Sequence, residues 1–260
     1  MIQPLAYVSP EAKLANNVMI DPFVTIHKNV EIDEGTYIAS NVTIMEGARI
    51  GKNVKIFPGA VISAIPQDLK FDGEPSLTII GDNTIIRESV TLNRGTSASG
   101  KTIIGANCLL MAYVHVAHDC VIGDNCILAN CVQLAGHVEI GEYAIIGGLS
   151  AVHQFAKIGS HVMISGGSLV RKDVPPYSKA AREPLSYEGV NSIGLRRRGY
   201  SSEKIAEIQE IYRILYLRGY NNAAALKKIE AEMPASKERD EILSFIKVSD
   251  RGIMKGFWSK

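Results

Sequence analysis

The feature that most constrains this chain is a six-residue repeat of aliphatic residues. Of the 28 positions reached in steps of six from Val8 to Val170, 25 are Ile, Leu or Val. An α-helix repeats its buried face about every 3.6 residues and a strand about every two, so neither alone produces this period. The period is typical of short strands that alternate with turns, with one aliphatic side chain of each strand pointing inward. It indicates a repetitive β structure over most of the chain.

A second column of small or β-branched residues lies four positions after the aliphatic one. Three of the four cysteines, Cys108, Cys120 and Cys126, occupy this column, and the chain contains no CxxC pair. We therefore interpret these cysteines as small core residues rather than as reactive groups or metal ligands. Glycine often follows the aliphatic residue, as in Ile122-Gly123, which suits a backbone bend where a side chain would clash.

Two segments interrupt the repeat. Residues 65–77 (IPQDLKFDGEPSL) and residues 95–101 (GTSASGK) lack the aliphatic column. A stacked repeat accommodates such segments only as loops that leave its wall, and loops often carry function. For the second segment, a functional loop and a plain surface loop are equally compatible with the sequence.

The repeat ends at Asp173-Val174-Pro175-Pro176, because proline cannot continue a ladder of backbone hydrogen bonds. Beyond a mixed stretch, helical spacing and start and stop signals predict three helices. Their apolar faces hold Ile205, Ile208, Tyr212 and Leu215, then Leu226, Ile229 and Met233, then Ile242, Phe245 and Ile246. We therefore expect a β domain over residues 1–176 and a small helical domain over residues 177–260.

The charge pattern excludes some classes of function. The chain has 28 basic and 27 acidic residues, so it shows no overall affinity for polyanions, and we expect no nucleic-acid partner. Residues 177–260 are basic, with 16 Lys or Arg against 11 Asp or Glu, whereas the preceding part has 12 against 16. Apolar runs are too short for a membrane-spanning helix, and the first residues lack the pattern of a secretory signal. We therefore expect a cytoplasmic protein with free thiols.

The repeat resembles that of the hexapeptide-repeat acyltransferases over about residues 8–175. This resemblance implies a mainly β fold, a left-handed parallel β-helix of triangular section with three hexapeptides per coil, here followed by the helical domain. Such prisms usually assemble as homotrimers. With three hexapeptides per coil, residue i lies under residue i+18, one strand spacing of about 4.8 Å away.

This stacking brings polar residues of the middle coils together. His118 lies under Gly136, which lies under Gln154, and Asp119 lies under His137. Histidine can accept a proton from an attacking hydroxyl, and a backbone N–H one coil away can face the oxygen that becomes negative. Either Asp119 or a backbone carbonyl could determine which ring nitrogen of His118 is free. No Ser or Cys is placed for a covalent intermediate, so the column favours direct acyl transfer, although solvated polar positions on a coil wall are the alternative.

Metal binding is a competing interpretation. The gamma-class carbonic anhydrases, a related hexapeptide family, bind zinc through three histidines. His118 and His153 have nearly the required separation, but the positions about five residues after His153 are Lys157, Ile158 and Gly159. We therefore expect no metal ligands, with a zinc enzyme or a non-catalytic scaffold as alternatives.

Longer sequence blocks resemble one family within this group, the UDP-N-acetylglucosamine acyltransferases, which carry out the first step of lipid A synthesis. The blocks follow one another along essentially the whole chain. They are PQDLKF (66–71) with GEP (73–75), RESVTLNRGT (87–96), residues 107–121, LAGH (134–137), IIGG (145–148), AVHQF (151–155), DVPPY (173–177) and GLRRRG (194–199).

The resemblance implies transfer of an (R)-3-hydroxyacyl group from acyl carrier protein to the glucosamine 3-hydroxyl of UDP-N-acetylglucosamine. The donor is the phosphopantetheine thioester of the carrier, so no separate cofactor is implied, and the basic helical domain suits an acidic carrier. His118 matches the general base, and Gly136 matches the backbone N–H that binds the oxyanion. Matches to substrate-binding positions are Gln67, Asp68, His115, His137 and Gln154 for the sugar and acyl cleft, His153, Asn191, Arg197 and Arg198 for the uridine and phosphates, and Gly166 for the far end of the acyl groove.

The sequence departs from the family pattern at two places. Asn93 replaces a common histidine, which leaves a 3-hydroxyl and a 3-amino acceptor both open, as is the acyl chain length. Residues 180–184 (AAREP) replace a common Gly-Asn pair, which leaves the carrier contacts open. Two alternative activities are a later N-acyltransferase of the pathway and an acetyl-CoA-dependent sugar acetyltransferase. The former generally has an additional N-terminal domain, for which a repeat starting at Val8 leaves no room, and the latter tends to lack blocks 87–96 and 194–199.

Overall fold

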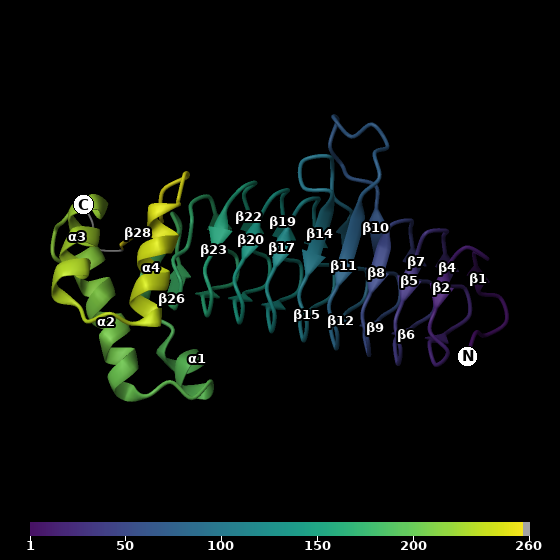
Figure 1. The fold of residues 1–260 in the computed structure, drawn as a ribbon, viewed down its shortest axis with the longest axis horizontal. Coiled ribbons are helices and arrows are strands. Elements are labelled where there is room, and N and C mark those ends of the chain that lie inside the picture. The colour runs from purple at the N-terminus through teal and green to yellow at the C-terminus, as the bar shows by residue number, and fades with distance from the viewer. Residues whose placement is uncertain (257–260) are drawn as a thin grey trace.

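The structure, a computed structural model, describes residues 1–256 and contains a long prism of short parallel strands followed by helices (Figure 1). The strands form three sheets, one for each wall of the prism, and each strand pairs with the third strand after it. The first wall consists of β1 (Tyr7–Val8), β4 (Thr25–Ile26), β7 (Thr43–Ile44), β10 (Val61–Ala64), β13 (Thr91–Asn93), β16 (His115–Val116), β19 (Gln133–Leu134), β22 (Ala151–Val152) and β25 (Leu169–Val170).

The other two walls repeat this arrangement. The second consists of β2 (Lys13–Leu14), β5 (Glu31–Ile32), β8 (Ala48–Ile50), β11 (Leu77–Ile80), β14 (Lys101–Ile104), β17 (Val121–Ile122), β20 (Glu139–Ile140) and β23 (Lys157–Ile158). The third consists of β3 (Met19–Ile20), β6 (Tyr37–Ile38), β9 (Lys55–Ile56), β12 (Ile85–Ile86), β15 (Leu109–Leu110), β18 (Ile127–Leu128), β21 (Ile145–Ile146) and β24 (Met163–Ile164). The predicted fold class, a left-handed parallel β-helix with C-terminal helices, is confirmed.

The aliphatic column fills the inside of the prism. From Ile20 to Val170 its members in the strands are at most 3% exposed, and each contributes roughly 1.5–3 kcal/mol by burial. Cys108, Cys120 and Cys126 are buried in the same core, as their positions in the repeat predict, and Cys120 lies 3.2 Å from the carbonyl oxygen of Ala135. All four cysteines are free thiols.

The turns between walls place one residue in the left-handed backbone region. Asn107 and Asn125 have φ of 55° and 59°, a region that asparagine tolerates better than most residues. Asp119, His137 and Phe155 occupy equivalent positions in three successive coils, with φ of 59°, 61° and 64°. Because these residues are 18 apart, they stack along the edge between the first and second walls.

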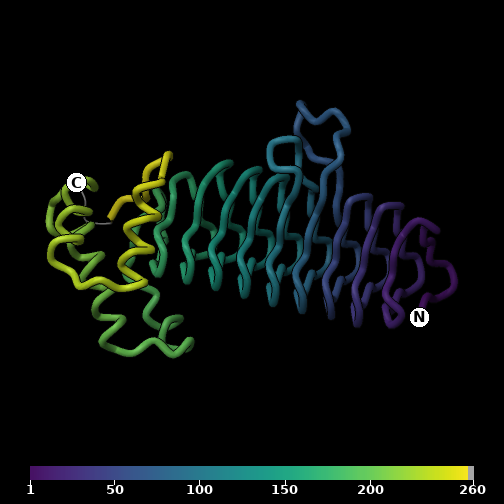
Figure 2. The backbone as a smooth tube through the Cα atoms, in the orientation of Figure 1, coloured from purple at the N-terminus to yellow at the C-terminus, as the bar shows by residue number. Residues whose placement is uncertain are grey.

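The two interruptions are loops, as predicted, and both leave this same edge (Figure 2). Thr43 pairs with Val61, an offset of 18 residues, but Val61 pairs with Thr91 and Thr91 pairs with His115, offsets of 30 and 24. The first loop therefore adds 12 residues and the second adds 6. Both lengths are multiples of six, which is why the aliphatic column keeps its phase along the sequence.

Four helices and a short sheet extension follow the prism. β26 (Ser178–Ala181), β27 (Ser186–Val190) and β28 (Lys255–Gly256) extend the third wall, so sheet structure continues beyond Pro176. The helices are α1 (Ser192–Arg197), α2 (Ser202–Leu217), α3 (Asn222–Glu232) and α4 (Lys237–Lys247). The three predicted helices correspond to α2, α3 and α4, whereas α1 was not predicted. Residues 257–260 of the predicted helical domain lie outside the described residues.

Side chains cap the predicted helices as their sequences suggest. Ser201, Asn221 and Ser236 accept a backbone hydrogen bond at the starts of α2, α3 and α4, respectively. Within the described part of the chain, no helix is both long and apolar enough to cross a membrane.

Candidate active site

The candidate site is built around His118 and Asp119, in the turn between β16 and β17. Both residues are buried, at 7% and 5% exposure, and Nδ1 of His118 lies 2.8 Å from Oδ2 of Asp119. Of the two alternatives that the sequence left open for orienting the ring, the structure favours Asp119. Nε2 of His118 has no hydrogen-bond partner among residues 1–256, so it is free to meet a ligand.

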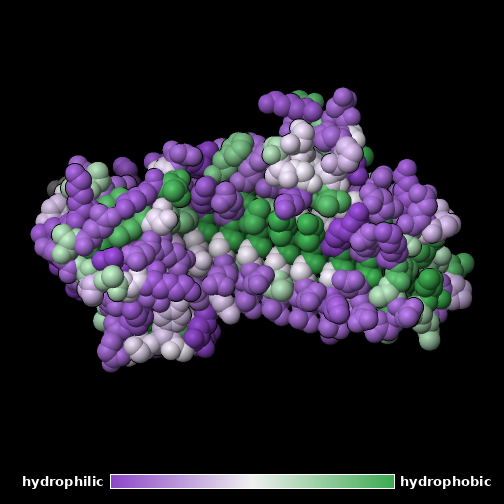
Figure 3. All heavy atoms as spheres, viewed as in Figure 1, coloured by the Kyte–Doolittle hydropathy of each residue, from purple (hydrophilic) through white to green (hydrophobic). Residues whose placement is uncertain are grey.

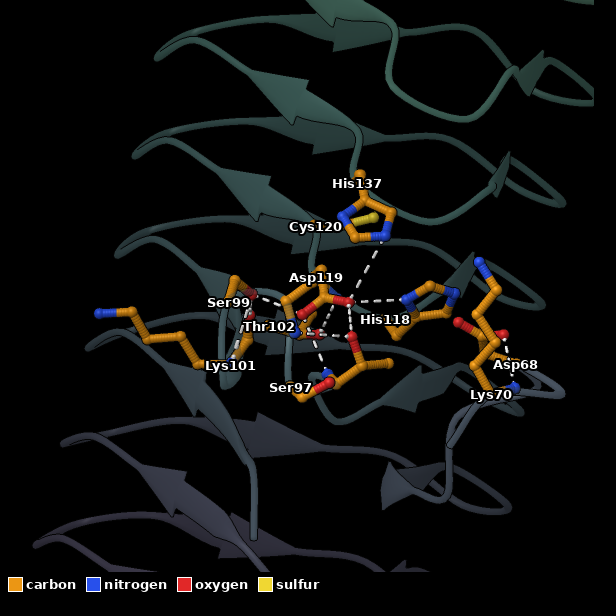
Figure 4. Close-up of polar contacts among 12 residues, drawn as sticks. Asp68, Lys70, Ser97, Ser99, Lys101, Thr102, His118, Asp119, Cys120 and His137 are labelled. Carbon is orange, nitrogen blue, oxygen red and sulfur yellow. Dashed lines mark hydrogen bonds and ion pairs between the residues drawn. The ribbon is translucent and has the colours of Figure 1, made fainter. Parts of the chain in front are cut away.

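The carboxylate of Asp119 is held by the second loop. Oδ1 accepts hydrogen bonds from the backbone N–H of Thr96 at 2.9 Å and from Oγ of Ser99 at 2.5 Å, and Oδ2 accepts one from Oγ1 of Thr96 at 2.6 Å (Figure 4). Burial alone would raise the pKa of Asp119, but the hydrogen bonds from Ser99, Thr96 and His118 outweigh it and lower that pKa to about 2. The carboxylate is therefore ionised at neutral pH and accepts a hydrogen bond from the N–H at Nδ1 of His118.

Gly136 lies directly against the ring of His118. A Cβ atom on Gly136 would be 2.6 Å from Cε1 and 2.7 Å from Nε2 of His118, which no real side chain could tolerate without displacing the ring. The backbone is aligned by a 3.0 Å hydrogen bond from the N–H of His137 to the carbonyl oxygen of His118. Among the described residues, none accepts a hydrogen bond from the N–H of Gly136. The predicted stacking of an imidazole and a glycine amide is therefore present.

His137 completes this cluster. Its ring packs edge-on against that of His118, with centroids 5.1 Å apart, and stacks on Phe155, with centroids 4.5 Å apart. Nε2 of His137 lies 3.7 Å from Oδ2 of Asp119. A cleft of about 660 Å³, lined in part by Ser99, Asp119, His137 and Phe155, opens beside the cluster.

Among residues 1–256, His118, Asp119 and His137 are also the three residues whose arrangement could hold a metal ion. Their candidate ligand atoms all lie within 4.8 Å of one another. However, the Asp119 carboxylate already accepts four hydrogen bonds, which use its lone-pair sites. A metal would have to displace several of these donors, so the cluster is better suited to hydrogen bonding than to metal binding.

Comparison with known proteins agrees with this geometry. Residues 173–254 match the family model described as "Udp N-acetylglucosamine O-acyltransferase; Domain 2", residues 101–136 match the bacterial transferase hexapeptide model, and residues 2–103 match a GMPPB C-terminal domain model. The acyl-[acyl-carrier-protein]–UDP-N-acetylglucosamine O-acyltransferase of Sulfurihydrogenibium sp. (strain YO3AOP1) is 60% identical over 253 residues, covering 97% of this chain and 93% of the relative.

This chain belongs to the UDP-N-acetylglucosamine O-acyltransferase family. The crystal structure of the UDP-N-acetylglucosamine acyltransferase from Bacteroides fragilis superposes with a TM-score of 0.97, at 55% identity, and covers 98% of this chain and 100% of its own. The crystal structure of the Francisella novicida UDP-N-acetylglucosamine acyltransferase superposes with a TM-score of 0.96 at 41% identity. The match covers 99% of this chain and 95% of the Francisella chain. The family resemblance predicted from the sequence blocks is confirmed.

In this UDP-N-acetylglucosamine O-acyltransferase family member, two other predicted residues, His115 and Asp68, lie near His118. His115, on β16, places Nδ1 2.7 Å from Oγ1 of Thr91, and burial lowers the pKa of His115. Oδ1 of Asp68, in the first loop, accepts a hydrogen bond from the N–H of Lys70 at 3.0 Å. In Figure 4 the ring of His118 lies between Asp119 and the loop that carries Asp68 and Lys70.

Three further predicted residues follow the same edge. Gln67 is exposed in the first loop, and His153 and Gln154 lie in the turn after β22. His153 is exposed, with Nδ1 3.0 Å from the carbonyl oxygen of Gln154, and Gln154 is half-buried. These side chains are accessible from the edge that carries His118.

The remaining predicted residues lie on the other two edges. Asn191 is buried, and its side chain caps α1 by accepting a 3.2 Å hydrogen bond from the N–H of Gly194 and donates to the carbonyl oxygen of His161 at 2.9 Å. Arg198 donates to the carbonyl oxygen of Tyr143 at 3.0 Å. Arg197 is exposed, and no hydrogen bond or ion pair of its side chain is found within residues 1–256. The structure does not bring these residues to His118 within one chain.

Gly166 lies on the third edge, in the turn between β24 and β25. It stacks on Gly148, whose carbonyl oxygen would lie 3.1 Å from a Cβ at Gly166. The site residues that the sequence did not predict are Thr96 and Ser99. Their loop has no periodicity, so only its three hydroxyl residues, one coil away from a predicted His-Asp pair, could have indicated them.

Proposed function

We propose that this protein transfers an (R)-3-hydroxyacyl group from acyl carrier protein to the glucosamine 3-hydroxyl of UDP-N-acetylglucosamine, as the first step of lipid A biosynthesis in the cytoplasm. The observation that carries the proposal is the free Nε2 of His118 directly beneath the backbone of Gly136. Relatives that align with almost the whole chain are named acyl-[acyl-carrier-protein]–UDP-N-acetylglucosamine O-acyltransferase. Both the geometry and the relatives therefore support the same reaction class.

In the proposed mechanism, His118 acts as a general base. The ionised Asp119 keeps a proton on Nδ1, which leaves the lone pair of Nε2 available for the sugar hydroxyl. The hydroxyl oxygen attacks the thioester carbonyl as Nε2 takes its proton, and the N–H of Gly136 donates to the carbonyl oxygen as it becomes negative. When the tetrahedral intermediate collapses, the C–S bond breaks and the protonated His118 returns its proton to the leaving thiolate.

The proposed mechanism needs no covalent acyl-enzyme. The hydroxyls of Thr96 and Ser99 donate to the Asp119 carboxylate, and that of Thr102 accepts a hydrogen bond from the backbone N–H of Asp119. Burial raises the pKa of the Cys120 thiol to about 12. None of these four groups is therefore suited to act as a nucleophile at neutral pH.

We further propose that the active enzyme is a homotrimer with sites between adjacent prisms. The predicted substrate residues occupy all three edges of one prism, so a neighbouring prism must supply the missing part of each site. Ile79, Ile103 and Val121 are register partners that face outward on the second wall, and Val121 is 41% exposed. Figure 3 shows a hydrophobic stripe along the middle of the prism, which supports packing against another copy.

The basic C-terminal domain supports acyl carrier protein as the partner. Residues 177–260 contain five more basic than acidic residues, and carrier proteins are acidic. Complementary charge accelerates encounter and orients the partners. The sites between prisms and this basic surface together would accept both substrates.

The deciding experiment is mass spectrometry of the product formed from UDP-N-acetylglucosamine with carriers of several acyl lengths and with acetyl-CoA in parallel. We expect an ester at the 3-hydroxyl from the carriers and none from acetyl-CoA. His118→Ala should lower kcat by roughly 10²–10⁴-fold while the oligomer remains intact, with the exposed His27→Ala as control. Full activity of His118→Ala would exclude His118 as base, and an acetylated product would exclude the proposed donor.

A further inference from the structure

The second loop is built around the carboxylate of Asp119. Thr96 donates to this carboxylate twice, through its N–H at 2.9 Å and its hydroxyl at 2.6 Å, and Ser99 donates once through its hydroxyl. We propose that Thr96 and Ser99 are positioning residues for acyl transfer, because they hold the Asp119 carboxylate in the orientation that directs Nε2 of His118 toward Gly136. This inference rests on the proposed role of His118 as general base.

The geometry leaves the carboxylate one orientation. An ionised carboxylate has about four lone-pair sites, and Thr96, Ser99 and His118 together supply four donors. The Asp119 side chain has no exposed surface and Thr96 is buried, so water cannot readily replace the Thr96 donors, whereas Ser99 is exposed beside the cleft. Removal of one hydroxyl would leave a buried charged oxygen with an unfilled site, which is unfavourable unless the carboxylate turns. A turned carboxylate would no longer restrain the ring of His118.

The other groups near the carboxylate do not offer the same restraint. His137 faces it at 3.7 Å, beyond hydrogen-bond distance, and contacts it through Nε2. The remaining charged residues lining the adjoining cleft are Glu139, Lys157, Asp173, Asp250 and Arg251, and none makes a hydrogen bond to Asp119. The position of the carboxylate therefore depends on the second loop.

The loop itself is rigid enough for this role. A Cβ on Gly95 would lie 2.2 Å from the backbone nitrogen of Lys101, so the two ends of the loop touch and only glycine fits there. The N–H of Gly100 donates to the carbonyl oxygen of Thr96 at 2.7 Å. These contacts close the loop, and within it the hydroxyls of Thr96 and Ser99 both donate to Asp119.

The second loop is also connected to the first. Oε1 of Glu74 accepts a hydrogen bond from the N–H of Ser97 at 2.8 Å, and Oε2 accepts one from the N–H of Asp72 at 2.9 Å. Glu74 thus joins the loop that carries Asp68 to the loop that holds Asp119. The connection places the proposed sugar-binding loop and the proposed base in one hydrogen-bonded assembly.

The test uses the single variants Ser99→Ala and Thr96→Val in the full-length protein. Because hydrogen bonds to charged groups are stronger than neutral ones, we expect each variant to lower kcat about tenfold, with KM for UDP-N-acetylglucosamine changed by less than about twofold. The acid limb of the profile of kcat/KM against pH should move to lower pH, because a turned carboxylate stabilises a positive charge on the neighbouring ring less well.

Two control variants separate positioning from folding. Ser97→Ala alters the same loop, but the Ser97 side chain is exposed and its hydroxyl makes no hydrogen bond within residues 1–256, so activity should be unchanged. Thr96→Ser keeps the hydroxyl and should restore kcat and the pH profile. In an Asp119→Ala background, Ser99→Ala should cause no further loss of kcat, because its effect passes through Asp119.

The outcomes distinguish this inference from the function on which it rests. Wild-type activity in His118→Ala or Asp119→Ala would overturn the proposed base and its partner. If those two variants lose activity but Ser99→Ala and Thr96→Val keep the wild-type kcat and pH profile, the positioning role is overturned. Losses that are fully additive in the Asp119→Ala background would also overturn it, because they would reveal a general structural effect.

Discussion

Oδ2 of Asp119 lies 2.8 Å from Nδ1 of His118, and the opposite side of the same ring lies against the backbone of Gly136. One nitrogen thus has an ionised partner, and neither the other nitrogen nor the backbone N–H beside it has a hydrogen-bond partner in the part of the chain that the structure describes. This arrangement orders three groups in a line, an anion, an imidazole and an amide donor. It determines what each of the following changes should do.

Gly136→Ala should impair catalysis without unfolding the protein. The new Cβ would approach Nε2 of His118 to 2.7 Å and displace the ring, and a displacement near 1 Å can cost about 10²-fold in rate. We expect kcat to fall by about that factor, as measured by steady-state kinetics. The control is Ser97→Ala, at an exposed position of the second loop, which should keep the wild-type kcat. Equal kcat for Gly136→Ala and wild type would contradict the contact.

Because of Asp119, the free energy of unfolding should depend on pH under acidic conditions. The pKa of Asp119 is lowered from 3.8 to about 2, so the ionised form stabilises the fold above pH 3.8 and this stabilisation is lost as the pH falls toward 2. The ionised Asp119 carboxylate contributes roughly 2 kcal/mol to the free energy of unfolding. Urea unfolding between pH 5 and pH 2 should show a smaller loss for Asp119→Asn than for wild type. Parallel curves would show that Asp119 does not contribute.

His161 should make stability depend on pH in a different range. Its ring is stacked between those of Tyr143 and Tyr177, with centroids 5.0 and 5.4 Å apart. Burial, followed by the charges of Arg198 and Lys237, lowers the pKa of His161 from 6.5 to about 4. The unfolded chain therefore binds a proton first, and stability should decrease as the pH falls from 6.5 to 4, by on the order of 3 kcal/mol.

The variant His161→Phe keeps a ring in the stack and removes the titrating group. It should flatten the unfolding free energy between pH 6.5 and pH 4, as measured by urea unfolding. The exposed His27→Phe should retain the wild-type slope. The same slope in His161→Phe as in wild type would assign the dependence to another group.

Arg197 and Arg198 should differ in their effects although they are adjacent. Arg198 is half-buried, donates to the carbonyl oxygen of Tyr143 and lies over the Tyr143 ring at 5.1 Å, whereas Arg197 is exposed. Arg198→Ala should lower the melting temperature by several degrees. Arg197→Ala should leave stability unchanged and raise KM for UDP-N-acetylglucosamine, by about tenfold if Arg197 pairs with a phosphate. Calorimetry and kinetics on both variants test this division, which a reversed pattern would refute.

Gly166 should influence which acyl chains are accepted. Gly166→Met would add a long side chain beside Gly148, at the position that the family resemblance assigns to the far end of the acyl groove. We expect activity with a carrier of 14 acyl carbons to fall by about tenfold or more relative to one of 10, because the longer chain would meet the new side chain. The measurement is a competition between the two carriers, with the two products quantified by mass spectrometry. The same product ratio in Gly166→Met and wild type would show that the groove ends elsewhere.

Much of the fold could be predicted because the period of six survives the loops. The 18-residue offset between the paired residues His115 and Gln133 recurs in most of the strand pairs. It correctly predicted that Gly136 lies against His118. The same 18-residue offset also relates pairs of aromatic rings. Tyr143 and His161 are 18 apart at the left-handed turn position, as are His137 and Phe155, and both pairs are stacked rings.

The rest could not be predicted because periodicity gives no side-chain direction in loops. Thr96 and Ser99 reach Asp119 only through the closed conformation of the second loop, which depends on Gly95 and on the contact with Glu74. Helix α1 was missed because its sequence, SIGLRR, has a single buried residue, Leu195, and hence no apolar face. The contacts of Arg198 arise where α1 meets the prism, a junction that no repeat describes.

The way the prism finishes has a consequence for assembly. A column of parallel strands would expose unpaired backbone groups on its last coil and so invite another column to add end to end. Here β26 and the antiparallel β27 continue the third wall, and the helices lie beyond them at that end (Figure 1). The C-terminal region therefore works as a terminator that limits growth along the axis and leaves the sides of the column as the surfaces on which copies can meet.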